Sequence, residues 1–178
     1  IVNGGPIGYG AYTDLLFPNA WSLTTWFRIH DFADSPTDSF GIYYDGYNAG
    51  WKFQFFIYWQ FDSATWNIGL SDDSENSVIS WNPTVTINAD TWYFLRLSYD
   101  GTAGRFVYQL DNGAEQFSPT SYTLYTTATS ARLNLLFIDE HGTGTRWVDW
   151  DEFNFWDGVL SAAEVNTIWN GGAGSTYP

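Results

Sequence analysis

Apolar and polar residues alternate with a period of two along most of the chain, and helical periodicity is almost absent. In segment 51–61 every odd position is apolar, from Trp51 to Phe61, and most positions between them are polar. Segment 21–30 repeats the pattern, with its odd positions predicted to face a core. A one-residue slip would expose the whole apolar row, so this pattern determines the faces of both strands. The other face of segment 21–30 carries Ser22, Thr24, Trp26, Arg28 and His30.

Seven further segments have the composition of strands and are separated by turn sequences such as Asp100-Gly101 and Asn112-Gly113. About nine or ten strands at this spacing indicate a sandwich or a barrel rather than a parallel sheet with crossover helices. The additional strands are predicted at Ser39–Asp45, Thr65–Leu70, Val78–Trp81, Trp92–Tyr99, Arg105–Leu110, Arg132–Ile138 and Trp147–Trp156.

One short helix is predicted near the C-terminal end of the sequence. Ser161 and Glu164 have the spacing of a capping box, in which the serine oxygen accepts the Glu164 amide and the glutamate reaches back. Val165, Ile168 and Trp169 then fall on one helical face, and the glycine pair at 171–172 ends the segment. We expect this helix to lie across a sheet edge and to be structural.

The charge of the chain excludes several classes of partner. Its 20 acidic and 6 basic residues give a formal net charge of −14. Nucleic-acid binding depends on clustered Lys and Arg, and anionic membrane surfaces attract the same cations, so neither partner is expected. The longest apolar stretches are of strand length, which predicts no membrane insertion. The acidity suits divalent cations, neutral ligands or simple solubility.

Three segments carry recognisable motifs: residues 91–113 with the sequence TWYFLRLSYDG at their start, residues 148–165 with VDWDEFNFW and LSAAEV, and Ser22–Arg28. Together they resemble the laminin-G-like, or concanavalin A-like lectin/glucanase, superfamily. The resemblance implies an all-β fold, a two-sheet antiparallel jelly-roll sandwich with one short C-terminal helix, which forms a single domain over residues 1–178. It implies little about function, because this fold carries lectins, adhesion modules, enzymes and structural subunits.

A structural Ca²⁺ site is one candidate for chemistry. Asp151 shares its parity with Phe153 and Phe155, which predicts a carboxylate on the core-facing side of its strand. Burying a carboxylate is unfavourable unless it is paired, hydrogen-bonded or bound to a metal. Ca²⁺ takes carboxylate and carbonyl oxygens, and Asp14 is a candidate second ligand. The alternative is an aspartate that caps backbone N–H groups.

An aromatic platform on an outer sheet face is the second candidate. Stacking rings among amide and charged side chains suit a sugar, whose apolar face stacks while its hydroxyls form hydrogen bonds. The alternative is that loops or a partner subunit cover these aromatics, which then form a second core. Loop residues near strand ends could add contacts. The candidate ligand-binding residues are Trp26, Arg28, Tyr43, Asp45, Phe56, Tyr58, Trp150 and Trp156.

Catalysis is not expected. Glycan hydrolases with this fold place paired carboxylates in a Glu-x-Asp-x-x-Glu pattern, which the sequence lacks. Asp149 and Asp151 differ in type and spacing, and both are predicted to face inward. We therefore expect a non-catalytic binding or adhesion module that recognises carbohydrate or a glycosylated surface, within a larger extracellular, cell-surface or virion-surface (phage-tail-type) protein. The alternative is a structural subunit that assembles with copies of itself into a filament, fibre or capsid.

Overall fold

The computed structural model describes residues 7–8, 20–30, 39–47, 51–60, 65–71, 77–119, 131–138 and 148–174. Side chains are described within residues 20–30, 65–68, 81–119 and 149–174 and at positions 57 and 59. The elements are β1 (Ile7–Gly8), β2 (Ala20–Ile29), β3 (Ser39–Tyr47), β4 (Trp51–Gln60), β5 (Thr65–Ser71), β6 (Ser77–Trp81), β7 (Trp92–Asp100), β8 (Arg105–Leu110), β9 (Gln116–Phe117), β10 (Ala131–Ile138), β11 (Val148–Asp157), α1 (Ala162–Trp169) and the 3₁₀ turn η1 (Asn170–Gly172).

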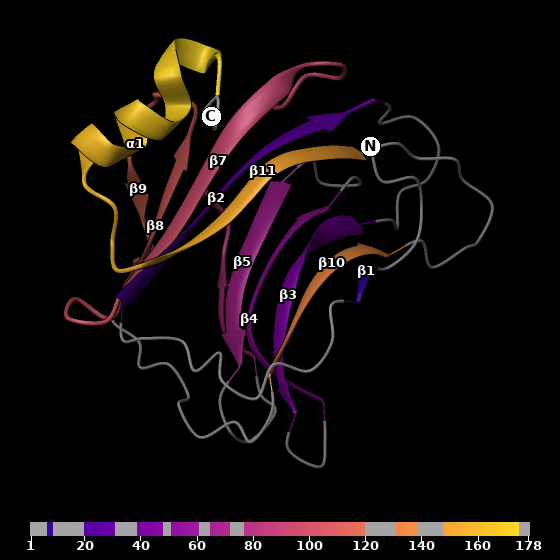
Figure 1. Ribbon diagram of the computed structural model, residues 1–178. Helices are drawn as coiled ribbons and strands as arrows, with labels where there is room; N and C mark the ends of the chain where they lie inside the picture. The colour runs from indigo at the N-terminus through magenta and orange to yellow at the C-terminus, as the bar shows by residue number, and fades with distance from the viewer. Residues whose placement is uncertain are drawn as a thin grey trace.

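The strands form two antiparallel sheets (Figure 1). One has six strands in the order β1-β10-β3-β4-β5-β6, and the other has five in the order β11-β2-β7-β8-β9. The prediction of an all-β antiparallel fold with one short C-terminal helix is confirmed. Each of the nine predicted strands is present, and the ends agree within two residues. The strands β1 and β9, which are two residues long, were not predicted.

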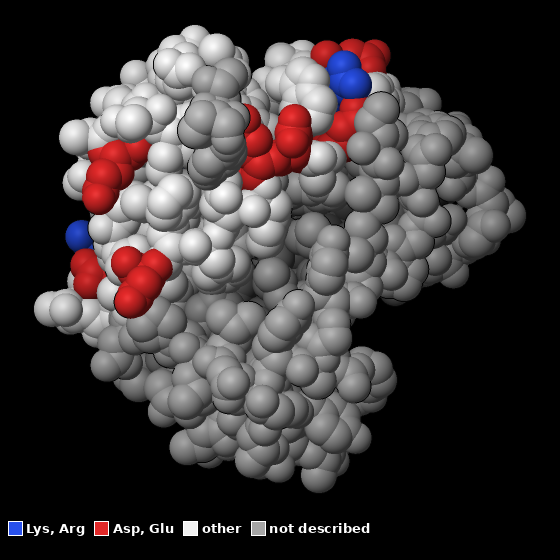
Figure 2. Space-filling view, in the orientation of Figure 1, with Lys and Arg blue, Asp and Glu red and all other residues white. Residues whose placement is uncertain are grey.

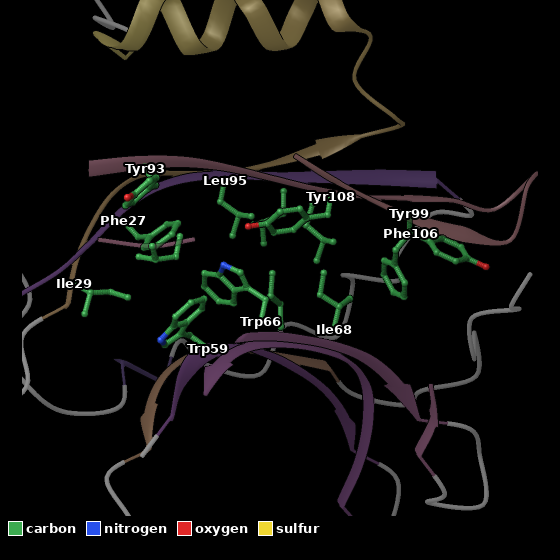
Figure 3. Packing of buried hydrophobic residues seen from close by; sticks show 14 of the residues in the cluster. Phe27, Ile29, Trp59, Trp66, Ile68, Tyr93, Leu95, Tyr99, Phe106 and Tyr108 are labelled. Carbon is green, nitrogen blue, oxygen red and sulfur yellow. The ribbon is translucent and has the colours of Figure 1, made fainter. Parts of the chain in front are cut away.

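An aromatic core lies between the two sheets (Figure 3). Phe27 from the five-stranded sheet meets Trp66 from the six-stranded sheet edge to face, with ring centroids 5.3 Å apart. Trp66 also packs against Trp59, whose centroid lies 5.5 Å away. Large rings bury much apolar surface per residue, and edge contacts of this kind are favourable beyond their buried area. The odd positions of segments 21–30 and 51–61 with described side chains lie in this core, as predicted, apart from the buried Thr25.

The helix α1 lies on the outer face of the five-stranded sheet, on the side away from the core (Figures 1 and 3). Its buried residues Val165 and Ile168 belong to a second apolar cluster with Trp26 and Phe94, against which Trp156 packs. The prediction that the helix crosses a sheet edge was therefore wrong. The alternative that the outer aromatics form a second core is correct for this part of the outer face, since α1 of the same chain covers them.

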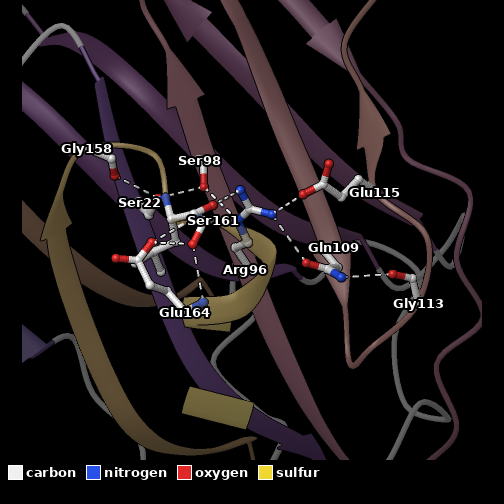
Figure 4. A network of polar contacts seen from close by, with 10 residues as sticks. Ser22, Arg96, Ser98, Gln109, Gly113, Glu115, Gly158, Ser161 and Glu164 are labelled. Atoms are coloured by element: carbon white, nitrogen blue, oxygen red, sulfur yellow. Dashed lines mark hydrogen bonds and ion pairs between the residues drawn. The ribbon is translucent and has the colours of Figure 1, made fainter. Parts of the chain in front are cut away.

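A polar network fastens the segment that leads into α1 to the sheet (Figure 4). Arg96 is 2% exposed, and its guanidinium donates to Ser98 Oγ at 3.0 Å and to the Leu160 carbonyl at 2.7 Å. The same group contacts Glu115 and donates to Gln109. The network therefore satisfies the buried guanidinium and ties β7 to the residue before the helix cap.

The two ends of α1 are capped by local hydrogen bonds. Glu164 N–H donates to Ser161 Oγ at 3.4 Å and Ser161 N–H donates to Glu164 Oε2 at 2.8 Å, so the predicted capping box is confirmed. Asn170 ends the helix in a left-handed conformation, and its side-chain amide donates to the Gly174 carbonyl at 2.9 Å. The chain after α1 is thereby folded back onto the same outer face.

Candidate functional site

A β-bulge interrupts β11 on the outer face of the five-stranded sheet. Asp151 pairs with Trp26 and Asn154 pairs with Thr24, so β11 advances three residues while β2 advances two. Glu152, inside this step, has a φ of 47°, which is unusual for a residue other than glycine. Bulges change the direction of nearby side chains and are common beside functional sites. This one alters the alternation of faces along the strand.

The bulge explains why the sequence assigned several β11 residues to the wrong face. Trp150 was predicted to face outward, but its ring lies 6.0 Å from Phe27 and packs against the core. Asp149 and Asp151 were predicted to face inward, but Asp151 is exposed and Asp149 contacts the outward-facing Arg28. The bulge adds one residue to β11, so an alternation of faces counted back from Phe155 assigns every residue before the bulge to the opposite face.

A pocket of about 200 Å³ lies beside the bulge. Trp26, which is 7% exposed, lines it together with Trp92, which is 38% exposed. In Figure 2 acidic groups gather in a hollow beside α1 and over β11, with a basic group next to them. We call this cavity the acidic aromatic pocket; its lining is Trp26, Trp92, Asp151, Glu152, Gly172, Ala173 and Gly174.

The chain after α1 forms one wall of the acidic aromatic pocket. Gly174 is buried with φ of 71°, and a Cβ atom there would lie 2.8 Å from Glu152 Oε1. The Gly174 amide donates to the Trp169 carbonyl at 3.4 Å, which holds this segment against the end of the helix. The positive φ therefore favours glycine at this position, and a side chain there would displace the Glu152 carboxylate.

An ion-pair network borders the pocket. Asp149 Oδ2 lies 3.0 Å from Arg28 Nε and 2.9 Å from His30 Nε2, and His30 Nδ1 lies 2.6 Å from Asp90 Oδ1. Hydrogen bonds to Asp90 and Asp149 raise the pKa of His30. Burial acts to raise the pKa of Asp149, but the hydrogen bonds from Arg28 and His30 outweigh it and hold that pKa below its usual value.

Trp92 joins the network to the pocket. The Arg28 guanidinium carbon lies 4.9 Å from the centroid of the Trp92 ring, a cation–π geometry. Trp92 also lines the pocket, so the network fixes the position of an indole that is otherwise partly exposed.

Comparison with known proteins identifies the family. The family model described as the concanavalin A-like lectin/glucanases superfamily matches residues 4–166. The chain belongs to this superfamily. No curated protein sequence matches the chain. Among the described residues, no helix is long and apolar enough to span a membrane.

Solved structures share the fold at low sequence identity. The receptor binding domain of botulinum neurotoxin mosaic serotype C/D is 15% identical with a TM-score of 0.61, over 85% of this chain and 36% of that chain. A structure of botulinum neurotoxin type C is 14% identical with a TM-score of 0.57, over 85% and 35%. The sialidase of Trypanosoma rangeli is 12% identical with a TM-score of 0.57, over 84% and 22%. The chain thus spans about a third or less of these proteins.

The predicted ligand-binding residues do not lie together in the structure. Trp26 lines the pocket and Arg28 borders it, whereas Trp156 lies under α1, with its Nε1 donating to Thr24 Oγ1 at 3.0 Å. Phe56 and Tyr58 alternate along β4 with the buried Ile57 and Trp59, and their side chains lie outside the described residues. The same holds for Tyr43 and Asp45, for which the structure gives only the strand pairing in β3.

Calcium binding at Asp151 was predicted because the carboxylate was expected to be buried, and it is not. Asp151 is exposed rather than buried, and its Oδ1 accepts the Glu152 amide at 2.8 Å. Within the described part of the chain no group of three or more His, Cys, Asp or Glu side chains gathers, and Ca²⁺ binding stays a prediction. Asp14, the predicted second ligand, lies outside the described residues.

Three residues of the pocket lining, Trp92, Glu152 and Gly174, are not among the predicted ligand-binding residues. A signal existed for Trp92, because Tyr93, Leu95 and the later odd positions of β7 face the core, which places Trp92 on the outer face with Trp26. The alternation that predicted an outward-facing Trp150 also placed Glu152 on the outer face. No signal existed for the bulge that brings Asp151 beside it, since the bulge contains no glycine and its sequence reads as a continuous strand.

Proposed function

We propose that the chain is a non-catalytic carbohydrate-binding module of a larger extracellular protein, and that the acidic aromatic pocket holds the sugar. One observation carries this proposal: two indole rings and two carboxylates line a single small pocket on the outer face of the sheet. Sugar recognition uses both kinds of group. An indole stacks on the C–H face of a pyranose, and a carboxylate accepts hydrogen bonds from the hydroxyl groups of the sugar.

The size of the pocket fits one sugar ring. The pocket has a volume of about 200 Å³. This is below the range of pockets for larger organic ligands, about 300–1,000 Å³. The partly exposed Trp92 leaves room for a glycan to continue into solvent.

The structural neighbours support the proposal. Cell entry by the botulinum neurotoxin type C of that comparison is described as dependent upon interaction with two ganglioside molecules. A glycan partner, an extracellular setting and a place within a longer protein are in line with such neighbours. The two sheets and shared core fit the jelly-roll arrangement expected from the sequence.

The test is binding to a glycan array, followed by calorimetry of the best ligand with matched variants. Trp92→Ala should lower affinity at least ~10-fold, which is about 1.4 kcal/mol, with little change in melting temperature. Phe117→Ala is the control, because Phe117 is 43% exposed on β9 and lies outside the pocket lining. Equal effects of the two substitutions, or new reducing ends released from the bound glycan, would contradict the proposal.

The alternative of a self-assembling structural subunit has lost part of its motivation, because α1 of the same chain already covers Trp156 and much of Trp26. Size-exclusion chromatography with light scattering separates the two functions: a monomer is expected for the module and a large assembly for the subunit.

A further inference from the structure

We propose that protonation of His30 fixes the position of Trp92, so that sugar binding by the acidic aromatic pocket weakens when His30 loses its proton. This inference rests on the proposed function and names a form of regulation of the same pocket. His30 directly follows β2 and lies outside the pocket lining, so it is a positioning residue that acts on the ligand through Trp92.

Strand register brings the residues of this device together on the outer face of the sheet. Arg28 pairs with Asp149 of β11 on one side and with Trp92 of β7 on the other, so the three form one row across three strands. His30 lies two residues beyond Arg28 and therefore on the same face. Asp90, two residues before Trp92, donates its backbone N–H to the last carbonyl of β2 at 2.7 Å, which places it beside His30.

The imidazole of His30 bridges two carboxylates. Its Nδ1 lies 2.6 Å from Asp90 Oδ1, and its Nε2 lies 2.9 Å from Asp149 Oδ2. An ionised carboxylate has no hydrogen to donate, so both ring nitrogens must donate, and only the imidazolium carries two N–H groups. The neutral ring has one N–H and one acceptor nitrogen, which would face a carboxylate oxygen. Loss of the proton therefore breaks one of the two contacts.

Each contact of His30 leads to Trp92 by a different route. The contact with Asp90 holds the turn from which the backbone enters β7 at Trp92. On the other side, Asp149 Oδ2 accepts hydrogen bonds from His30 and from Arg28 Nε and Nη2. The same carboxylate oxygen thus orients the guanidinium that lies over the Trp92 ring. Whichever contact is lost, one support of this partly exposed indole is weakened.

The charges around His30 favour the imidazolium. Within the described residues, the charged groups that face it are Arg28 from β2, Asp90 from the turn before β7 and Asp149 from β11. Hydrogen bonds to Asp90 and then to Asp149 raise the pKa of His30 above its ordinary 6.5, against the opposing effects of burial and Arg28. The bridge is complete below pH 6.5 and is lost as pH rises through the raised pKa. The pocket should therefore bind sugar more tightly at pH 6 than at pH 9.

The first measurement needs no ligand. The intact chain, labelled with ¹³C, is titrated from pH 6 to 9, and the ring C–H resonances of Trp92 are followed by NMR and assigned from their absence in Trp92→Phe. We expect them to shift with the same midpoint as the ring resonances of His30. Trp59, which is 1% exposed in the core, is the internal control and should not shift. Trp92 resonances that do not follow the His30 titration would overturn the proposal.

The second measurement is sugar affinity over the same pH range. Lactose, cellotriose and the N-acetylglucosamine trimer are the probes, because they carry no group that titrates there. Calorimetry should show an affinity about two- to fivefold lower at pH 9 than at pH 6, as expected for partly exposed ion pairs. His30→Gln should bind with the lower affinity at every pH. His141→Gln removes the other histidine of the chain and is the matched control, which should keep the pH dependence of the parent.

The outcomes separate the two proposals. No binding of any probe at any pH overturns the proposed function, and the Trp92 resonances still decide whether His30 positions the ring. Binding that is equally strong at pH 6 and pH 9, or a pH dependence that persists in His30→Gln, overturns the regulation but leaves carbohydrate binding in place. A pH dependence that disappears in His141→Gln also overturns it. Melting curves at pH 6 check that each variant keeps the fold.

Discussion

The outer face of the five-stranded sheet has two parts built from similar residues but with different environments. Under α1, Trp156 and Phe94 are packed by Val165 and Ile168, and Arg96 is fully enclosed. Beside α1, aromatic and charged side chains meet at the surface: Trp92 is 38% exposed and Arg28 lies over its ring. The same chemistry is structural in one part and available to ligands in the other. What differs is whether a segment of the chain covers it.

The comparison shows that outward-facing aromatics cannot be interpreted strand by strand. A tryptophan on the outer face is a site candidate only after the connections that pack on that face are known. The following predictions test the contrast between the part covered by α1 and the open part.

The largest effect is expected at the enclosed cation. Arg96→Met should lower the free energy of unfolding by about 3–5 kcal/mol, because it leaves the buried partners of the guanidinium without it. Urea denaturation measures this loss. Arg105→Met is the control: its guanidinium lies 4.3 Å from the Phe117 ring near the edge of the sheet, and a loss of about 1 kcal/mol or less is expected. Similar losses of stability in Arg96→Met and Arg105→Met would mean that the enclosed Arg96 network stabilises the protein no more than a surface contact does.

Two tryptophans give a direct comparison of the covered and open parts. Trp156→Ala should lower the free energy of unfolding by about 3 kcal/mol, since it removes packing under α1 and the hydrogen bond to Thr24. Trp92→Ala should lower it by about 1 kcal/mol or less, because the ring is partly exposed. Thermal and chemical unfolding measure both. A reversed order would assign Trp92 to the core and Trp156 to the surface.

The glycines after α1 separate strain from contact. Gly174→Ala and Gly171→Ala both place alanine at positive φ, with values of 71° and 65°, and each should lower stability by about 1–2 kcal/mol. Only at Gly174 does the added Cβ meet Glu152, whose flexible carboxylate can move aside. Gly174→Ala should therefore weaken glycan binding while Gly171→Ala should not. Calorimetry of both variants against the same ligand decides this, and equal binding would show that the Glu152 position is unimportant.

The smallest effect is expected from the network that borders the pocket. The raised pKa of His30 means that its contribution is complete below the unfolded value near 6.5 and is lost as pH rises through the higher folded value. The group is near the surface, so the change should be less than about 1 kcal/mol. Melting temperatures of the parent and of His30→Gln between pH 6 and 9 test this. Parallel curves would mean that His30 carries no charge that matters for stability.

Much of the fold could be predicted because its strands and its helix are determined by local patterns in the sequence. The alternation in β2 and β4 predicted the core positions of Phe27 and Trp59, and the Ser161–Glu164 pair predicted the helix start. These are local signals, and the structure keeps them. The position of α1 on the outer face could not be predicted in this way, because it depends on tertiary contacts such as the hydrogen bond from Arg96 to the Leu160 carbonyl.

The site was harder to predict than the fold. The bulge between Asp151 and Asn154 leaves no mark in the amino-acid pattern, and it reverses the expected faces of Trp150 and Asp151. Phe153 and Phe155 suggested a regular strand because both contact the core despite the extra residue. Regular alternation therefore placed Glu152 on the outer face with Trp26 and Arg28, but it put Asp151 on the core-facing side, away from the pocket that Asp151 lines.

The bulge also makes the length of β11 informative when related chains are compared. Removal of the single residue Glu152 would restore regular alternation and leave Trp150 and Phe155 paired with Phe27 and Leu23, as they are now. The core would be preserved, but one of the two carboxylates that line the pocket would be lost. A one-residue insertion or deletion at this point can thus create or abolish the acidic aromatic pocket without altering the scaffold. Among relatives, a gap at this position should distinguish chains with this pocket from chains without it more reliably than the identity of any tryptophan.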